Sequence, residues 1–139
     1  MAHGKKRLAK PRITLTQTDH KRLTLLAEEN ADRMASVTDA LFVELDRARV
    51  VPDRKIAENT VRMGSDVCFS SDLEETRQIS LVFPGQADID KGRISILTPI
   101  GAALIGLSTG QSMDWTTRDG RTQRLTVEAV DPPIETSPE

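Results

Sequence analysis

Hydrophobic positions in the first third of the chain recur every three or four residues. Between Leu15 and Val51 they form two runs, separated by a polar segment at residues 30–35. This spacing predicts two amphipathic helices, and the short connection between them favours an antiparallel helical hairpin. The two apolar stripes consist of Leu23, Leu26 and Ala27, and of Val37, Ala40, Leu41, Leu45 and Ala48.

Polar residues indicate where these helices begin and end. Thr16 or Thr18 can cap the first helix, and Asp19 suits its positive amino end. Ser36 is expected to open the second helix, and Pro52 to stop it. Since two short helices bury little surface alone, we expect the hairpin to dock on a larger unit.

After Pro52 the period changes to two, which predicts β-strands. The Asp119-Gly120 pair predicts a tight hairpin turn, because both residues tolerate positive φ. The segments 72–75 and 84–92 are expected to be a chain reversal and a looser loop. The alternating apolar positions are Val61 and Met63, Val67 and Phe69, Ile79, Leu81 and Phe83, Ile94 and Ile96, Met113 and Trp115, and Leu125 and Val127.

The least polar stretch, "ISILTPIGAALIGLSTGQSMDW", combines apolar residues with three glycines and a proline. We interpret its start as a strand, followed by a short helix that Thr98 caps and Pro99 opens. Gly106 is placed to end that helix. The glycine spacing of residues 101–108 is that of a phosphate-binding loop, but Leu107 stands where the lysine is needed, so we exclude nucleotide binding here.

Composition adds limits to this pattern. The 139 residues fit one domain with a small appendage, and 19 basic against 21 acidic side chains give a net charge of −2. Residues 1–14 are expected to form a basic, solvated tail and residues 132–139 a second tail. Direct binding of nucleic acid is therefore not expected. The tail's basic residues are Lys5, Lys6, Arg7, Lys10 and Arg12.

Candidate metal ligands and nucleophiles are sparse. The lone Cys68 excludes an internal disulfide and suits the cytoplasm, and we find neither an export signal nor a membrane span. His3 falls in the tail and His20 on the polar side of the first helix, without partners at ligand spacing. We expect no metal, no cofactor and no catalytic residue. Trp115 is interpreted as a core or sheet-surface residue.

Three segments carry a family resemblance. "RISILTPIGAALIGLSTGQSMDW" resembles the C-terminal domain shared by the bacterial transcript-cleavage factors GreA and GreB, and "VRMGSDVCF" resembles its first hairpin. "TDALFVELDRARVV" is similar to the smaller family of regulators of nucleoside diphosphate kinase, Rnk. The resemblance implies an α+β fold, with a coiled-coil arm at residues 15–52 and an FKBP-like antiparallel sheet domain with one short helix at residues 53–131.

The same resemblance implies a partner and a docking site. In the related factors a D-S-P segment at this strand-to-helix junction docks on RNA polymerase near its secondary channel. Carried over by position, the polymerase-binding residues become Leu97, Thr98 and Pro99. Thr98 and Pro99 match in character, while Leu97 loses the acid. We therefore expect a monomeric transcription regulator that binds RNA polymerase and has no enzymatic activity.

The acidic arm tip of the cleavage factors is only partly matched. Their D-L-S-E-N-A-E-Y motif holds a catalytic magnesium ion, whereas this chain has "LAEENADR". Because the Asp-Leu-Ser portion and the closing aromatic are missing, we do not carry the catalytic role to Glu28, Glu29 or Asp32. The resemblance thus implies competition with GreA and GreB without transcript cleavage.

Three alternatives remain open at this stage. A Gre-like transcript cleavage factor is the nearest one. The FKBP-like fold also suggests a prolyl isomerase, although three Phe and one Trp make an aromatic-lined pocket difficult to build. A nucleic-acid-binding module would use the basic tail, and its binding would depend steeply on salt.

Overall fold

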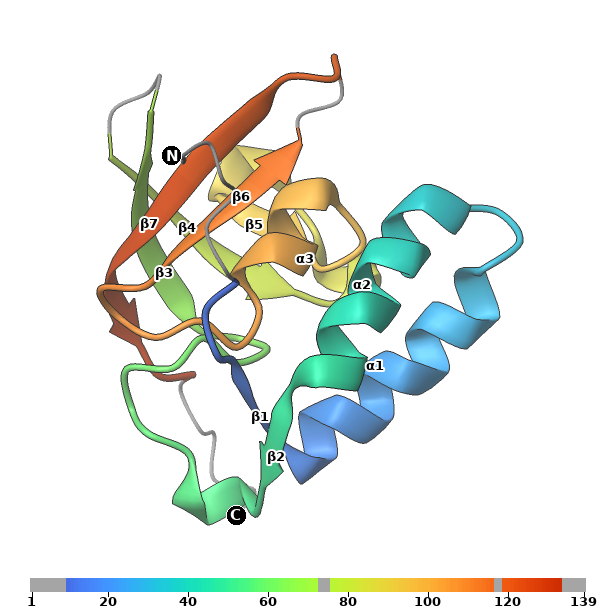
Figure 1. Ribbon diagram of the computed structural model, residues 1–139, viewed down its shortest axis with the longest axis horizontal. Coiled ribbons are helices and arrows are strands. Elements are labelled where there is room, and N and C mark those ends of the chain that lie inside the picture. Colours follow the sequence, from blue (N-terminus) through green and yellow to red (C-terminus); the bar gives the residue numbers. More distant parts are fainter. Residues whose placement is uncertain (1–9, 73–75, 117–118, 134–139) are drawn as a thin grey trace, which may run out of the picture.

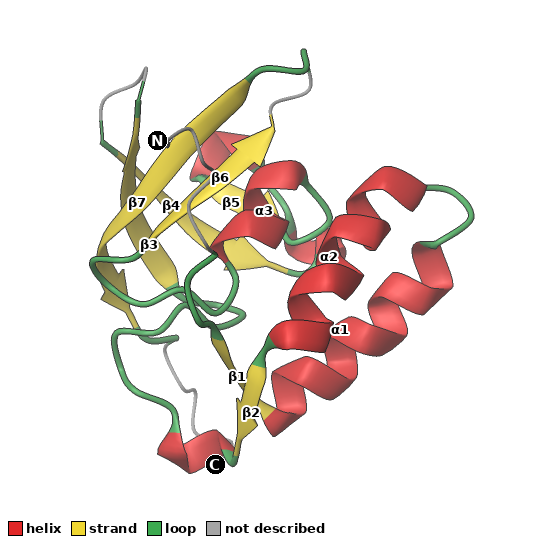
Figure 2. Cartoon of the chain, in the orientation of Figure 1, coloured by secondary structure: helices red, strands yellow, loops and turns green. Residues whose placement is uncertain are grey.

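The computed structural model describes residues 10–72, 76–116 and 119–133. It is an α+β structure in which two helices come first and a curled β-sheet follows (Figure 1 and Figure 2). A third, short helix lies between the sheet and the second helix (Figure 1). The basic residues 1–9 and the last residues, 134–139, lie outside the described part of the chain.

The first two helices, α1 (Gln17–Asn30) and α2 (Ala35–Arg47), lie side by side and form the unit that we call the helical arm (Figure 1). The amides of Arg33 and Met34 both donate to the Asn30 carbonyl, at 3.2 and 2.9 Å, and so tighten the connecting turn. The predicted stripes are confirmed in part: Ala40 is exposed, and Ala48 lies just beyond the end of α2. The most buried members of the stripes are Leu23 and Ala27 on α1, and Leu41 and Leu45 on α2.

The helix starts were predicted correctly in one case and wrongly in the other. Thr16 is the cap of α1, because its hydroxyl accepts the Asp19 amide at 3.0 Å. Ser36 does not open α2: the helix starts at Ala35 after Met34, which makes no side-chain cap bond. The turn from Asn30 brings the Met34 carbonyl into place to accept the Thr38 amide at 2.9 Å, so the helix begins earlier.

A two-stranded parallel sheet closes the base of the helical arm. It pairs β1 (Thr14–Thr16) with β2 (Arg49–Val51) (Figure 1). The helical pattern predicted from Leu15 to Val51 is therefore too long, because both of its ends are strands. The predicted tail boundary after residue 14 also moves, because Ile13 is only 1% exposed and its carbonyl accepts the Arg49 amide at 3.0 Å. The β-branched residues of β2 favour the extended backbone.

The larger sheet has five strands in the order β5-β4-β3-β7-β6. Three of its strand pairs are antiparallel, as expected, but β4 and β5 run parallel, which the sequence did not predict. The reason is the connection, residues 83–92, which contains two 3-10 helices (η2 and η3) and returns the chain in the same direction. The strands are β3 (Asp66–Ser71), β4 (Arg77–Val82), β5 (Arg93–Ser95), β6 (Ser112–Thr116) and β7 (Thr122–Asp131).

The antiparallel pairing expected around two turns is present, but the tight turn at Asp119-Gly120 stays a prediction, because residues 117–118 of that connection lie outside the described part of the chain. β6 and β7 pair antiparallel across the Asp119-Gly120 segment, where Gly120 has a φ of 88°. β3 and β4 pair antiparallel across the segment 72–75, of which residues 73–75 lie outside the described part.

The predicted strand at Val61 and Met63 is wrong. Both residues are buried, yet they lie outside every strand. Val61 instead packs against the end of the short helix: its amide donates to the Leu107 carbonyl at 2.7 Å, and its carbonyl accepts the Gly106 amide at 3.0 Å. The alternation in this segment therefore reflects burial on one side rather than pairing in the sheet.

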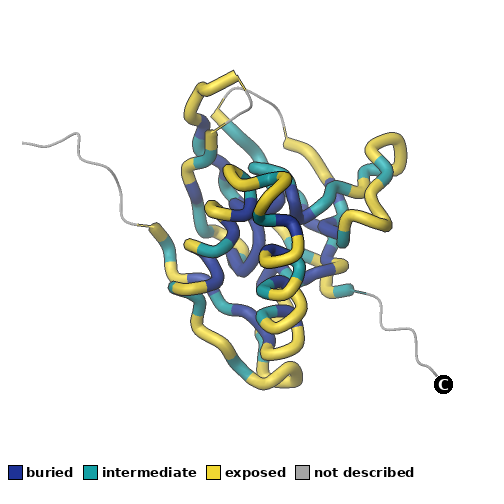
Figure 3. Tube along the Cα trace, turned by 90° about the vertical axis from the view of Figure 1, so that its right-hand side faces the viewer, coloured by how far each residue is buried: buried dark blue, intermediate teal, exposed yellow. Residues whose placement is uncertain are grey.

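A single hydrophobic core joins the helical arm to the sheet. It includes Leu23 and Leu41 from the arm, Leu104 from the short helix, and Leu81 and Leu125 from the sheet. Buried positions gather at the centre of the molecule, and exposed positions at its edge (Figure 3). The arm is therefore docked on a larger unit, as expected. No helix in the described ranges is long and apolar enough to cross a membrane.

Candidate functional site

The strand-to-helix junction at residues 97–99 is built around Thr98. Its hydroxyl accepts the Gly101 amide at 3.0 Å and donates to the Ser95 carbonyl at 2.7 Å, which confirms the predicted cap. Pro99 is the first residue of the short helix α3 (Pro99–Leu104). Leu97 is 5% exposed, whereas Thr98 and Pro99 are half-buried. Of the three predicted site residues, Leu97 is therefore mainly a core residue.

The glycines of the P-x-G-x-A-L-x-G run have steric roles. A Cβ added at Gly101 would lie 2.5 Å from the Ser95 carbonyl oxygen, so α3 can pack on the preceding turn only without a side chain there. Gly106 has a φ of 83°, and a Cβ there would lie 2.8 Å from Cβ of Ile13. The amides of Ala102 and Ile105 are occupied within the helix, which supports the exclusion of a phosphate loop.

A groove of about 720 Å³ lies between α2, α3 and β6. Two of the predicted site residues, Leu97 and Pro99, line it, while Thr98 does not. Its lining is largely apolar on the α3 side and mixed toward the helical arm. The other side chains that matter here are Val37 and Ala40 on α2, Ala102 on α3, and Met113 and Trp115 on β6. Trp115, expected in the core or on the sheet surface, is thus half-buried in the groove wall.

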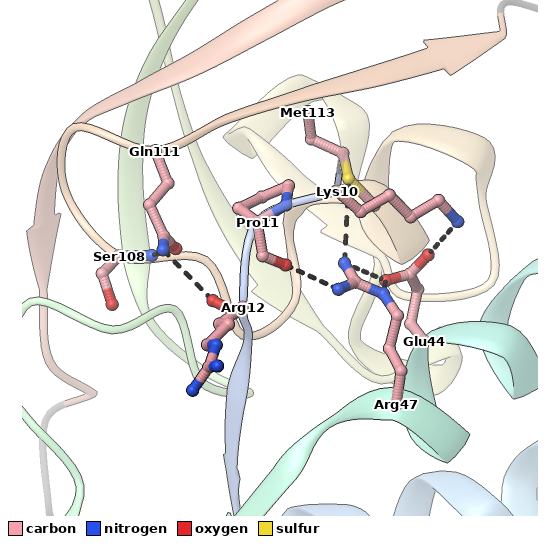
Figure 4. A network of polar contacts seen from close by, with 8 residues as sticks. All are labelled: Lys10, Pro11, Arg12, Glu44, Arg47, Ser108, Gln111 and Met113. Carbon is pink, nitrogen blue, oxygen red and sulfur yellow. Dashed lines mark hydrogen bonds and ion pairs between the residues drawn. The ribbon is translucent and has the colours of Figure 1, made fainter. Parts of the chain in front are cut away.

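The groove is also lined by a buried carboxylate, Glu44, which is 4% exposed and belongs to a network of polar contacts (Figure 4). It binds the Lys10 ammonium at 3.0 Å and the Arg47 guanidinium at 2.7 Å. Arg47 also donates to the Pro11 carbonyl at 2.5 Å and lies 4.0 Å from the Met113 sulfur. The network joins the N-terminal segment, α2 and β6.

Sequence reasoning missed Glu44. The one signal available was its position three residues before Arg47, the spacing of an ion pair on a helix. That spacing is common on solvated helix faces, so it does not by itself indicate burial.

The base of the helical arm is tied to the sheet by Asp19, which is 7% exposed. Its carboxylate accepts the Met63 amide at 3.0 Å. Burial raises the pKa of Asp19 above its ordinary value, and the bond from Met63 and the nearby Arg62 and Arg22 oppose that rise. The Arg22 guanidinium also lies 4.3 Å from the centre of the Phe83 ring.

The prediction that His20 lies on the polar side of the first helix is wrong. Its Nε2 is 3.1 Å from the Leu45 carbonyl, so the ring bridges α1 and α2. Glu28, Glu29 and Asp32 are exposed, and they belong to the end of α1 and the turn that follows it. That turn lies at the end of the arm away from β1 and β2 (Figure 1). No group of three or more His, Cys, Asp or Glu side chains in the described ranges could hold a metal ion.

Comparison with known families agrees with this organisation. The profile "Transcription elongation factor, GreA/GreB, C-term" matches residues 56–132, and the profile "Rnk N-terminus" matches residues 11–51. The division falls between β2 and β3, where the period changes along the chain.

Individual relatives match different shares of the chain. The chain is 32% identical to the regulator of nucleoside diphosphate kinase of Escherichia coli (strain K12), over 86% of this chain and 89% of that protein. It is 37% identical to transcription elongation factor GreA of Thermodesulfovibrio yellowstonii, over 61% of this chain and 60% of that protein. The solved structure of a prokaryotic transcription elongation factor GreA/GreB from Nitrosomonas europaea has a TM-score of 0.70 and 33% identity, and the match covers 86% of this chain and 99% of that one.

The α+β fold, with a helical arm docked on a curled sheet, is similar to that solved structure and is of the GreA/GreB type. The chain belongs to the family that joins an Rnk N-terminus to the GreA/GreB C-terminal domain. The matched relatives are named as regulators or elongation factors, and not as classical enzymes.

Proposed function

We propose that the protein regulates transcription by binding RNA polymerase near its secondary channel, where it competes with GreA and GreB without stimulating transcript cleavage. In this proposal the sheet domain is FKBP-like and docks on the polymerase as a monomer in the cytoplasm. Any influence on nucleoside diphosphate kinase, suggested by the name of the Escherichia coli relative, then acts indirectly through transcription.

The observation that carries the proposal is the position of Pro99. It is half-buried, opens α3 and lines the groove, so part of its ring is available to a partner. The cap bonds of Thr98 fix the start of α3, and the side chain of Leu97 is buried in the core next to it. In this proposal Pro99 makes the contact with the polymerase, and Thr98 and Leu97 position it.

The helical arm supports the second half of the proposal. Since α1 has 14 residues, it extends only about 21 Å. Its exposed tip carries Glu28, Glu29 and Asp32 without the rest of the cleavage motif. An arm of this kind can enter a pore without presenting a magnesium site to the transcript.

The prolyl isomerase alternative gains no support from the groove. Trp115 is the one aromatic side chain in its lining. An apolar pocket that grips a proline ring would need more aromatic surface.

The experiment is a pull-down with purified bacterial RNA polymerase, comparing Pro99→Asp with Pro84→Asp. Pro84 is a matched control, because it is exposed and also opens a short helix, the 3-10 helix η2 (Pro84–Gln86). We expect Pro99→Asp to lose polymerase binding and Pro84→Asp to retain it, with unchanged circular dichroism for both. Equal binding by both variants would remove this junction from the interface.

A further inference from the structure

β6 lies at the edge of the five-stranded sheet, so one side of its backbone is not paired with another strand. The register with β7 shows which groups point to that side. Gly110, with a φ of 91°, donates to the Val127 carbonyl at 2.8 Å, and the Val127 amide donates to the Gln111 carbonyl at 3.0 Å. Gln111 and Val127 are therefore a hydrogen-bonded pair next to a glycine bulge.

Antiparallel pairs alternate along a ladder, so Met113–Leu125 and Trp115–Gln123 are also hydrogen-bonded pairs. Ser112, Asp114 and Thr116 consequently direct their amides and carbonyls away from β7. Side-chain contacts agree with this assignment, because the closer, non-hydrogen-bonded pairs bring side chains together. Ser112 and Thr126 lie 2.7 Å apart through their hydroxyls, and Arg124 binds Asp114 at 3.1 Å.

No described residue forms a hydrogen bond with the outward amides of Ser112 and Asp114. The groove runs along this edge, since Met113, Asp114 and Trp115 all line it. Residues of α2 and α3 also belong to its lining. A strand added about 4.8 Å from β6 would therefore enter the groove.

We propose that this edge and groove bind an extended segment of a partner protein, which adds to the sheet as a strand beside β6. Its alternate side chains would point the same way as Met113 and Trp115, toward the apolar surface of Leu97 and Ala102. We therefore expect every second residue of the bound partner segment to be apolar. The partner's main chain supplies the hydrogen bonds, and its side chains supply the selectivity.

Charge around the groove selects an acidic residue at one end of that segment. Among the lining side chains and their ion-pair partners, four are basic and two are acidic, so two positive charges are in excess. Arg33 forms no ion pair with a described residue; its guanidinium donates to the Asn30 side-chain oxygen at 2.6 Å. The basic residues are Lys10, Arg33, Arg47 and Arg124, and the acidic residues are Glu44 and Asp114.

The direct test uses a capped hexapeptide in which valine alternates with threonine and the first residue is glutamate. In an antiparallel arrangement its threonine amides face β6 and its valine side chains face the groove. The readout is the fluorescence of Trp115, the one tryptophan of the chain. We expect saturable binding by the parent peptide and by a version methylated on two valine amides, and none by a version methylated on its two threonine amides.

A pair of variants at position 114 tests the same edge from the protein side. Asp114→Pro removes the outward amide of an edge strand, where proline is tolerated, while Asp114→Ala keeps that amide and removes the charge. Both variants lose the same negative charge beside the groove, so the difference between them isolates the amide. We expect the proline variant to bind the parent peptide roughly tenfold more weakly than the alanine variant, which should bind the acidic peptide no more weakly than the unchanged protein. Near-ultraviolet circular dichroism checks that both are folded.

The proposal is overturned if the parent peptide does not bind, if the two methylated peptides behave alike, or if the two variants bind equally. These outcomes are separate from the polymerase pull-down. If the protein binds the peptide but not the polymerase, the proposed function is contradicted and the peptide-binding proposal stands.

Discussion

The Asp19 carboxylate accepts a hydrogen bond from the Met63 amide at 3.0 Å, across 44 positions of sequence. Asp19 lies in the first turn of α1, and Met63 lies in the segment that leads into β3. This contact therefore joins the part matched by the Rnk N-terminus to the part matched by the GreA/GreB C-terminal domain. Since it buries an ionisable group, it should also make folding depend on pH.

The first prediction concerns Asp19→Asn. Burial raises the pKa of Asp19 above its ordinary value of 3.8, so the folded state binds the proton more tightly than the unfolded state. Its stabilising contribution is complete below pH 3.8 and is lost as the pH rises through the folded pKa. Relative to the unchanged protein, Asp19→Asn should therefore become progressively more stable as the pH rises from 3.8 through the folded pKa. Urea unfolding at a series of pH values measures this difference.

Asp53→Asn is the control, because its effect should have the opposite sign. Hydrogen bonds from Thr18, first from its side chain and then from its amide, lower the pKa of the exposed Asp53 below 3.8. Its contribution is present above that value and is lost as the pH falls through the folded pKa. If the two variants change with pH in the same direction, the assignment for Asp19 is wrong.

The second prediction concerns the buried carboxylate of Glu44. Glu44→Gln leaves Lys10 and Arg47 without their charged partner, and both cations are partly exposed. We expect a loss of about 1–3 kcal/mol in the free energy of unfolding, as for hydrogen bonds to charged groups. Asp46→Asn, at an exposed position of the same helix, should stay within about 0.5 kcal/mol. Equal effects in denaturant unfolding would mean that the network contributes no stability.

The third prediction compares two glycines. Gly101→Ala places a Cβ 2.5 Å from the Ser95 carbonyl oxygen and 2.9 Å from Cα of Ile96. Because both neighbours are backbone atoms, the short helix must shift, and we expect a loss of roughly 1–3 kcal/mol. Gly85→Ala has no atom within 4 Å of its Cβ and should cost nothing. Thermal unfolding of both variants tests this, and an unchanged melting temperature for Gly101→Ala contradicts it.

Locally encoded features were predictable from the sequence. The start of α3 needs only a capping threonine followed by a proline, and Thr98 and Pro99 supply both. The alternation at Met113, Trp115, Leu125 and Val127 likewise predicted the β6–β7 hairpin. These signals depend on neighbours within a few residues, so one sequence is sufficient to read them.

Features that depend on distant partners were not predictable. β1 forms because Thr14 pairs with Arg49, and nothing close to Thr14 indicates that pairing. The burial of Glu44 depends on Lys10, which is 34 residues away. The groove arises where three separate elements meet, so no local signal indicated that Leu97 and Pro99 share a surface with β6.

The fourth prediction follows from the proposed function. If the junction at Pro99 docks as proposed, the arm that accompanies it has a tip without the D-L-S-E-N-A-E-Y motif, so the protein should occupy the polymerase without presenting a magnesium ion to backtracked RNA. Added in excess to a backtracked elongation complex, it should suppress the transcript cleavage stimulated by GreA or GreB in proportion to occupancy. Alone it should stimulate none. The measurement is the length of the labelled transcript over time, with Pro99→Asp as a variant that should fail to compete.

A different result would reassign the tip of the helical arm. If the protein shortens the backtracked transcript by itself, and Glu29→Ala or Asp32→Ala abolishes that activity, these exposed carboxylates hold the metal ion after all. Both positions are exposed, so alanine there should leave the fold and the docking junction unchanged. Loss of cleavage with polymerase binding intact would then identify a short-armed cleavage factor, because the defect would lie at the arm tip and not at Pro99.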